Sequence, residues 1–186
     1  MPNLYIISGC NGAGKTTASY SVLPDALECR TFVNADEIAK GLSPFQPETV
    51  SIQAGRIMLQ RIDDLIARGQ DFAFETTLSS KSYIQTIKKA QAQNYHVTLL
   101  YFWLNSPQLA IERVQKRVAA GGHNVPDDVV IRRYKRGLSN FLNLYVPICD
   151  YWLMVDNSVK LPEIIAKGKI ECININNSKL WYQIKQ

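Results

Sequence analysis

The chain has 186 residues, of which 46% are hydrophobic and 20% charged, and Lys and Arg outnumber Asp and Glu by 21 to 16. This composition is typical of one soluble globular domain. It excludes a membrane protein, because no apolar stretch approaches the roughly 18 residues that a membrane span requires. The first residues lack the basic leader of a signal peptide, and the four cysteines form no C-x-x-C pair. We therefore expect a cytoplasmic protein with reduced thiols and neither a zinc site nor disulfides.

Short apolar strands alternate with amphipathic helices along the chain. The expected strands span residues 4–8, 31–34, 72–75, 96–104 and 151–155. The expected helices span residues 14–23, 48–68, 80–93, 106–119 and 127–145. Because the strands are almost continuously apolar and are separated by helices, they predict a parallel sheet that is covered on both faces. We expect one α/β domain over residues 1–186.

Three segments depart from this alternation. The tail "IECINI", "NNS", "LWYQI" predicts a small antiparallel β-hairpin over about residues 168–185. Two connections, over residues 35–47 and 119–126, are longer than is usual in α/β folds. Long connections at the ends of strands often carry binding groups, so we expect both to contribute to a site.

The segment "SGCNGAGKTT", residues 8–17, follows the first strand and begins the first helix. It matches the nucleotide-binding pattern G-x-x-x-x-G-K-[ST], in which backbone N–H groups and a helix N-terminus surround phosphate oxygens. Lys15 is expected to reach the β- and γ-phosphates of ATP, and the Thr16 hydroxyl to bind Mg²⁺. The Cys10 thiol has either a pKa lowered by the helix N-terminus or a space-filling role. The predicted nucleotide-binding residues here are Gly9, Cys10, Asn11, Gly12, Ala13, Gly14, Lys15, Thr16 and Thr17.

Two other expected strands end in carboxylates. Asp36 and Glu37 follow the second strand in "VNADEI", and Glu75 ends the third in "FAFETT", followed by Thr76. At the carboxyl edge of a parallel sheet, beside a phosphate loop, a carboxylate can coordinate Mg²⁺ or accept a proton. The alternatives are that Asp36 only caps the following helix and that Glu75 is an exposed strand end.

Arginines gather in the two helices after the fourth strand. Residues 106–140 supply +4 of the net charge of +5. Arg113 and Arg117 share one helix face, and Arg132 and Arg136 repeat the spacing. The segment is either a pair of solvated faces or a lid, over about residues 106–145, that stabilises a transferring phosphoryl group and excludes water.

The connection "AAGGHNVP" joins these two helices. Gly121 and Gly122 would permit hinge motion of such a lid. His123 either contacts a phosphate or is merely exposed. The combination of lid, phosphate loop and carboxylates predicts a small-molecule kinase rather than a GTPase.

Several segments together resemble the zeta-toxin-like ATPase family, over residues 3–158. They are "GCNGAGKTT", "NADEIAKGL", "FETTLSS", "IERVQKRVAAGGHNVPDDVVIRRYKRGLSNF" and "VDNS". The resemblance implies a P-loop kinase fold and transfer of the γ-phosphoryl group of ATP to a hydroxyl of UDP-N-acetylglucosamine. It also implies an antitoxin partner that blocks the nucleotide site.

The resemblance assigns roles to single residues. Asp36 matches the family's catalytic base, and Glu75, with Thr76 beside it, matches the strand-end glutamate near the acceptor. Arg113 matches a catalytic lid arginine. The remaining candidates for a second lid arginine or an acceptor-binding group are Arg117, Arg132 and Arg133. Asn157, in "VDNS", lies either in a loop near the adenine or in a plain strand-ending turn.

Three functions compete. The favoured one is a kinase that uses Mg²⁺ and ATP and acts on a small phosphorylated or nucleotide-linked acceptor. The second is a polynucleotide, RNA-end or nucleoside kinase. Trp103, Trp152 and Trp181 all lie in strand patterns, so no separate stacking platform favours nucleic acid. The third is a nucleotide-dependent binding module or switch, which would need Lys15 and Thr16 without Asp36.

Overall fold

The protein is described by a computed structural model that covers residues 1–122, 124–169 and 172–185. Within these ranges the strands form a seven-stranded sheet in the order β2-β3-β1-β4-β5-β6-β7. The first five in this order are parallel, and β6 and β7 are antiparallel to their neighbours. The strands are β1 (Asn3–Ser8), β2 (Phe32–Val33), β3 (Phe72–Thr76), β4 (His96–Trp103), β5 (Tyr151–Asp156), β6 (Glu163–Lys169) and β7 (Cys172–Ile175).

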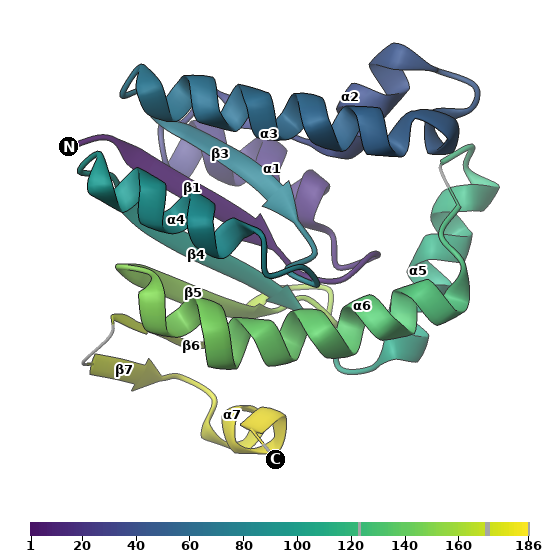
Figure 1. Cartoon of the computed structure of the whole chain (residues 1–186). Helices are drawn as coiled ribbons and strands as arrows, with labels where there is room; N and C mark the ends of the chain where they lie inside the picture. The colour runs from purple at the N-terminus through teal and green to yellow at the C-terminus, as the bar shows by residue number, and fades with distance from the viewer. Residues whose placement is uncertain (123, 170–171, 186) are drawn as a thin grey trace.

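Helices cover both faces of this sheet (Figure 1). The α-helices are α1 (Lys15–Ser21), α2 (Ala35–Leu42), α3 (Ser51–Ala67), α4 (Tyr83–Ala92), α5 (Pro107–Ala119), α6 (Asp127–Asn140) and α7 (Ser178–Lys185). Shorter helical turns extend α1 (Val22–Ala26), precede α3 (Pro47–Val50) and extend α6 (Phe141–Tyr145, Val146–Ile148). The prediction of a largely parallel α/β sheet covered on both faces is confirmed.

The sheet separates two hydrophobic clusters. On one face, α3, α4, α7 and the turn after α6 bury side chains such as Met58, Phe74 and Phe141. On the other face, α1 and α5 pack against the sheet, and Cys10 and Ala13 of the phosphate loop belong to that cluster. The phosphate loop is therefore held by the core rather than projecting from it.

The C-terminal segment differs from its prediction. A β-hairpin is present, but its strands are β6 and β7, and "LWYQI" is helical in α7 rather than a strand. Asn177 caps α7 by accepting a hydrogen bond from Leu180 N (3.1 Å). Trp181 then stacks on Trp152 of β5, with ring centroids 5.6 Å apart. Leu180, Trp181 and Ile184 all contact the core, which is the three-to-four spacing of a helix.

A further helix, α2, lies within the first of the two long connections. In the part of the chain that is described, no helix is long and apolar enough to cross a membrane.

Candidate active site

The loop between β1 and α1 packs closely against other parts of the fold. Gly12 and Gly14 have φ angles of 78° and 79°, which side chains rarely adopt. A Cβ atom at Gly12 would lie 2.7 Å from the carbonyl oxygen of Ala110, and one at Gly14 would lie 2.5 Å from Asn157 Nδ2. The loop is thus held between α5 and the end of β5, and both positions require glycine.

Cys10 is a structural residue of this loop. Its side chain is 2% exposed. Burial raises the pKa of the Cys10 thiol to about 11, although Lys15 and Arg113 act in the opposite direction. Of the two alternatives for Cys10, the lowered pKa is therefore wrong, since desolvation outweighs the positive groups, and the buried side chain fits the space-filling role.

Lys15, Thr16 and Glu75 meet at the centre of the site. Thr16 Oγ1 donates a hydrogen bond to Glu75 Oε2 (2.7 Å), and Lys15 Nζ lies 3.5 Å from Glu75 Oε1. Lys15 Nζ also donates to the carbonyl oxygen of Cys10 (3.0 Å). The Lys15 and Glu75 side chains are only 7% and 10% exposed. Glu75 is therefore not the exposed strand end considered above.

Asn34 joins this centre to α2. Its Nδ2 donates to Glu75 Oε2 (3.0 Å), and its Oδ1 accepts from the backbone N–H groups of Asp36 (2.8 Å) and Glu37 (3.4 Å). Asn34 is therefore the N-cap of α2, and Asp36 is already inside the helix. The alternative in which Asp36 serves as the helix cap is wrong.

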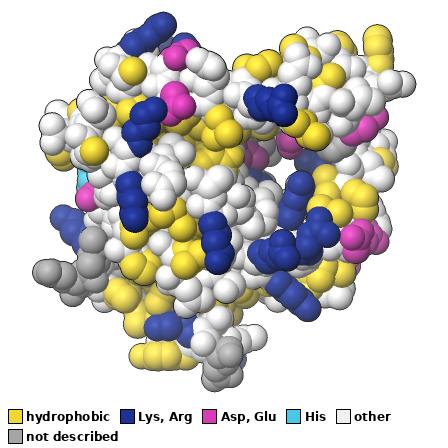
Figure 2. Space-filling view, in the orientation of Figure 1, with side chains coloured by type: hydrophobic (Ala, Val, Ile, Leu, Met, Phe, Trp, Pro, Cys, Tyr) yellow, Lys and Arg dark blue, Asp and Glu magenta, His cyan; other side chains and the backbone are white. Residues whose placement is uncertain are grey.

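The Asp36 side chain faces a cleft instead. It is exposed, and it lines a cavity of about 870 Å³ between α2, the start of α3, α6 and the described residues of the α5–α6 connection. Lys40 and Phe45 line one side of this cavity, and Arg132 and Arg133 line the other. Figure 2 shows the hollow, with Lys and Arg side chains along its border.

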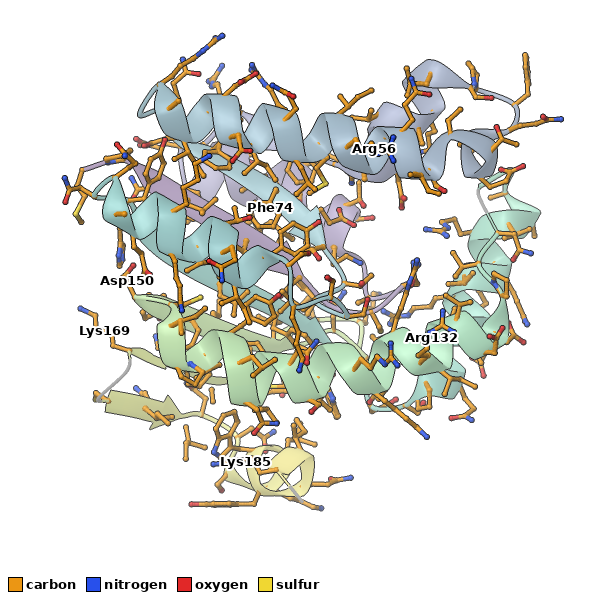
Figure 3. All side chains as sticks on the ribbon, in the orientation of Figure 1. Arg56, Phe74, Arg132, Asp150, Lys169 and Lys185 are labelled. Carbon is orange, nitrogen blue, oxygen red and sulfur yellow. The ribbon has the colours of Figure 1, made fainter. Side chains whose placement is uncertain are left out.

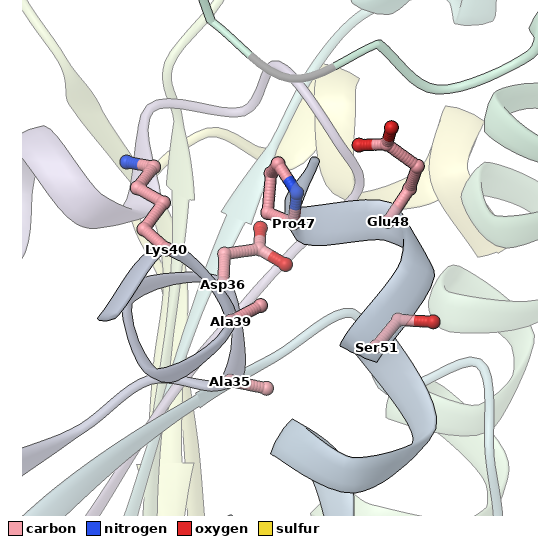
Figure 4. Close-up of a pocket in the computed structure, with 7 residues that line it drawn as sticks. All are labelled: Ala35, Asp36, Ala39, Lys40, Pro47, Glu48 and Ser51. Carbon is pink, nitrogen blue, oxygen red and sulfur yellow. The ribbon is translucent and has the colours of Figure 1, made fainter. Parts of the chain in front are cut away.

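Asp36 also borders a smaller recess of about 50 Å³ beside Pro47 and Glu48. In Figure 4 its carboxylate points from α2 toward Pro47, whereas the Lys40 amine points away. The cleft thus brings Asp36 and the basic side chains of α6 to the same cavity, beside Asn11 of the phosphate loop.

The arginines of α6 differ in their surroundings. Arg133 Nη1 donates to Asn11 Oδ1 (3.2 Å) in the phosphate loop. Burial lowers the pKa of the Arg133 guanidinium, while the nearby Asp36 charge raises it. Arg132, labelled in Figure 3, is 52% exposed and lies 3.9 Å from Asp128. Of these two, Arg133 is the one that contacts the phosphate loop.

The two arginines of α5 also differ in their contacts and in their distance from the phosphate loop. Arg113 Nη2 donates to the carbonyl oxygen of Ser158 (3.2 Å), and its Cβ would be 3.2 Å from a Cβ on Gly12. Arg117 is exposed near the end of α5, and its carbonyl oxygen accepts from Gly122 N (2.9 Å). The structure therefore brings Arg113 to the loop and leaves Arg117 farther along the helix.

The other predicted residues have varied positions. Thr17 is exposed on α1. Thr76 Oγ1 accepts from Leu78 N (3.1 Å) and so shapes the turn after β3. Asn157 Nδ2 donates to the carbonyl oxygen of Ala13 (2.7 Å), which ties the end of β5 to the phosphate loop. Gly121, one of the two expected hinge glycines, has a φ of 83° just after α5. His123, which was expected to contact a phosphate or to be exposed, lies outside the described residues.

Helix α6 is attached firmly to the sheet. Tyr134 Oη donates to the carbonyl oxygen of Leu104 (2.6 Å), and Asn140 Nδ2 donates to that of Leu78 (2.7 Å). A Cβ at Gly137 would lie 2.5 Å from the carbonyl oxygen of Thr77. These contacts hold Arg133 in place relative to the carboxyl ends of β3 and β4.

Asn34 is the functional candidate that our sequence reasoning missed. The signal was present, because an Asn directly before "ADE" is a typical N-cap. Its contact with Glu75, 41 residues away, could not be read from any local pattern.

This architecture, with a phosphate loop, carboxylates at the adjacent strand ends and arginine-bearing helices, is that of a P-loop kinase, and solved small-molecule kinases share the fold. The chain belongs to the zeta-toxin family, whose sequence model, described as "Zeta toxin", matches residues 1–148. It is also 34% identical over 126 residues to a protein of Haemophilus influenzae of uncharacterised function, covering 68% of this chain and 88% of that protein.

Two solved complexes contain similar folds. A chain of the AvrRxo1-ORF1:AvrRxo1-ORF2 complex has 18% identity and a TM-score of 0.80, and the match covers all of this chain and 64% of that one. The same complex has been solved with ATP. A chain of the PezAT chromosomal toxin–antitoxin system of Streptococcus pneumoniae has 15% identity and a TM-score of 0.65, covering 90% of this chain and 72% of that one.

Proposed function

We propose that this protein is a kinase that uses Mg²⁺ and ATP to phosphorylate a hydroxyl of a small phosphorylated or nucleotide-linked acceptor. A UDP-N-acetyl sugar is the first acceptor to test, since the family resemblance implies one. The observation that carries the proposal is the arrangement of two carboxylates about the phosphate loop. Glu75 is buried against Lys15 and Thr16, and Asp36 faces a cleft large enough for an acceptor.

The residues around Thr16 fit a magnesium ion. Magnesium usually takes one or two protein oxygens, with water and substrate phosphate completing its shell. The Thr16 hydroxyl and the Glu75 carboxylate, 2.7 Å apart, supply oxygens of this kind. The ion would neutralise charge on the β- and γ-phosphates.

The remaining residues serve transfer itself. In the proposed mechanism Lys15 holds the β- and γ-phosphates, and Asp36 takes the proton from the acceptor hydroxyl. Arg113 and Arg133 stabilise the charge on the transferring group, because each already contacts or borders the phosphate loop. Thr17 and Asn157 contribute to nucleotide binding, and Arg132 and Thr76 belong to the acceptor side.

The test is a transfer screen with γ-labelled ATP. UDP-sugars, nucleosides and RNA 5′ ends are offered in separate reactions, with Lys15→Ala as the inactive control. Labelled UDP-sugar supports the proposal, whereas label only on RNA ends or nucleosides supports the second candidate. ATP binding without transfer to any acceptor would favour a nucleotide-dependent switch.

We further propose a protein antitoxin as partner. The support is family membership, together with the toxin–antitoxin system named for one structural neighbour. A small open reading frame beside the gene, whose product co-purifies with this protein and lowers its ATP binding, is the expected finding.

A further inference from the structure

Asn34 is hydrogen-bonded both to the Glu75 carboxylate and to the backbone of Asp36, the residue that carries the other carboxylate of the site. Its Oδ1 accepts from the N–H of Asp36, and its Nδ2 donates to Glu75 Oε2. The residue is only 6% exposed. Both ends of the amide are therefore engaged in the interior of the protein, at the junction of β2 and α2.

Only one orientation of this amide satisfies its neighbours. If the amide were reversed, its Nδ2 donor would face the two backbone N–H donors of α2. Its Oδ1 acceptor would face the Glu75 carboxylate, which accepts hydrogen bonds but cannot donate them. Capping a helix needs only an acceptor, and Asp or Ser would supply one as well as Asn does. The feature that specifically requires Asn is therefore the donor that faces Glu75.

We propose that Asn34 is a positioning residue that keeps Asp36 in register with the Lys15–Thr16–Glu75 centre. This inference rests on the function proposed above. The Asn34 oxygen holds the backbone of Asp36 itself, so any shift of Glu75 is transmitted through one side chain to the proposed base. Misplacing reacting groups by about 1 Å can cost about a hundredfold in rate. Asn34 therefore acts on the transfer step more than on ATP binding.

Two substitutions separate positioning from capping. Asn34→Asp keeps the size and the cap but sets a carboxylate against Glu75. Asn34→Ser keeps a capping hydroxyl that is too short to reach Glu75. The matched control is Asn177, which caps α7 through the same kind of bond, far from α2 (Figure 1). Asn177→Asp and Asn177→Ser therefore alter a cap without altering the site.

We expect both Asn34 variants to lower transfer at saturating ATP by about tenfold or more, with a smaller change in the Kd for ATP. Both Asn177 variants should transfer at the wild-type rate. A loss in Asn34→Asp alone, with wild-type transfer in Asn34→Ser, would assign the effect to the added charge and overturn the proposal.

Hydrogen exchange gives a second readout that requires no acceptor. Amides of residues 35–38 are measured with and without Mg²⁺ and ATP. We expect the nucleotide to slow their exchange in the wild type, and this protection to be lost in both Asn34 variants but kept in the Asn177 variants. If the wild type phosphorylates none of the acceptors, the proposed function fails. Hydrogen exchange alone then decides whether Asn34 positions Asp36 or is only a helix cap. Full nucleotide-dependent protection in both Asn34 variants would then show that Asn34 is only a cap.

Discussion

Replacing Glu75 by Gln tests how strongly the protein depends on its buried ion pair. Glu75 Oε1 and Lys15 Nζ are 3.5 Å apart, and both side chains are at least nine-tenths buried. Removing one partner of a buried pair costs about 3–5 kcal/mol, because the other charge stays buried. Lys15 keeps the Cys10 carbonyl as acceptor, and Gln keeps an oxygen for Thr16, so we expect a loss of about 2–3 kcal/mol. For a chain of this size that is a fall in Tm of about 4–12 °C.

The surface pair of Lys89 and Asp63 provides the control. Its atoms are closer, at 2.6 Å, but its side chains are 53% and 56% exposed. Exposed pairs contribute about 0–1 kcal/mol, so Asp63→Asn should lower the Tm by at most about 4 °C. Both variants are followed by scanning calorimetry, with and without Mg²⁺ and ATP. Because the proposed mechanism gives Glu75 a part in Mg²⁺ binding, Mg²⁺ and ATP should raise the Tm of Glu75→Gln less than that of the wild type. A Tm shift no larger than that of Asp63→Asn would refute the reasoning.

Three predictions concern the proposed reaction. Lys15→Ala should abolish transfer and weaken ATP binding, since it removes the positive charge that would contact the β- and γ-phosphates. Near-normal turnover by the folded variant, measured with labelled ATP, would exclude this role. Arg113→Ala should lower kcat more than it raises the KM for ATP, by about 3–4 kcal/mol in transition-state stabilisation, and steady-state kinetics showing a change in KM alone would make Arg113 a ground-state binding group. Asp36→Asn should keep Mg·ATP affinity within a few-fold while transfer falls about a hundredfold or more; full transfer would contradict its role as base, and weak binding restored by added Mg²⁺ would make it a metal ligand.

Features that depend on contiguous residues could be predicted from the sequence. The phosphate loop is one, because a single run of residues supplies its turn, its lysine and its helix N-terminus. The parallel sheet is another, since each buried strand is an apolar run between helices. The bounds of the five predicted strands are within two residues of those in the structure.

The secondary structure of short segments was harder to predict, because a few apolar residues fit both the two-residue period of a strand and the 3.6-residue period of a helix. In "LWYQI" the sequence allows alternation, yet the segment is helical and its Trp181 stacks on Trp152 of β5. The second lid arginine was ambiguous for a related reason. Helical spacing shows which residues share a face, but it does not show which face is turned toward the phosphate loop. The contact of Arg133 with Asn11 depends on the attachment of α6 to the sheet.

The two carboxylates at the sheet edge show how environment divides their roles. One Glu75 oxygen accepts from both Thr16 and Asn34, and the other faces Lys15. Such a group is well placed to bind cations and poorly placed to take a proton from an incoming hydroxyl. In the described residues no hydrogen bond to the Asp36 carboxylate is seen, and that side chain lines the cleft. Paired carboxylates in different surroundings commonly perform different tasks. We therefore assign the base in the proposed mechanism to Asp36, and cation binding to Glu75.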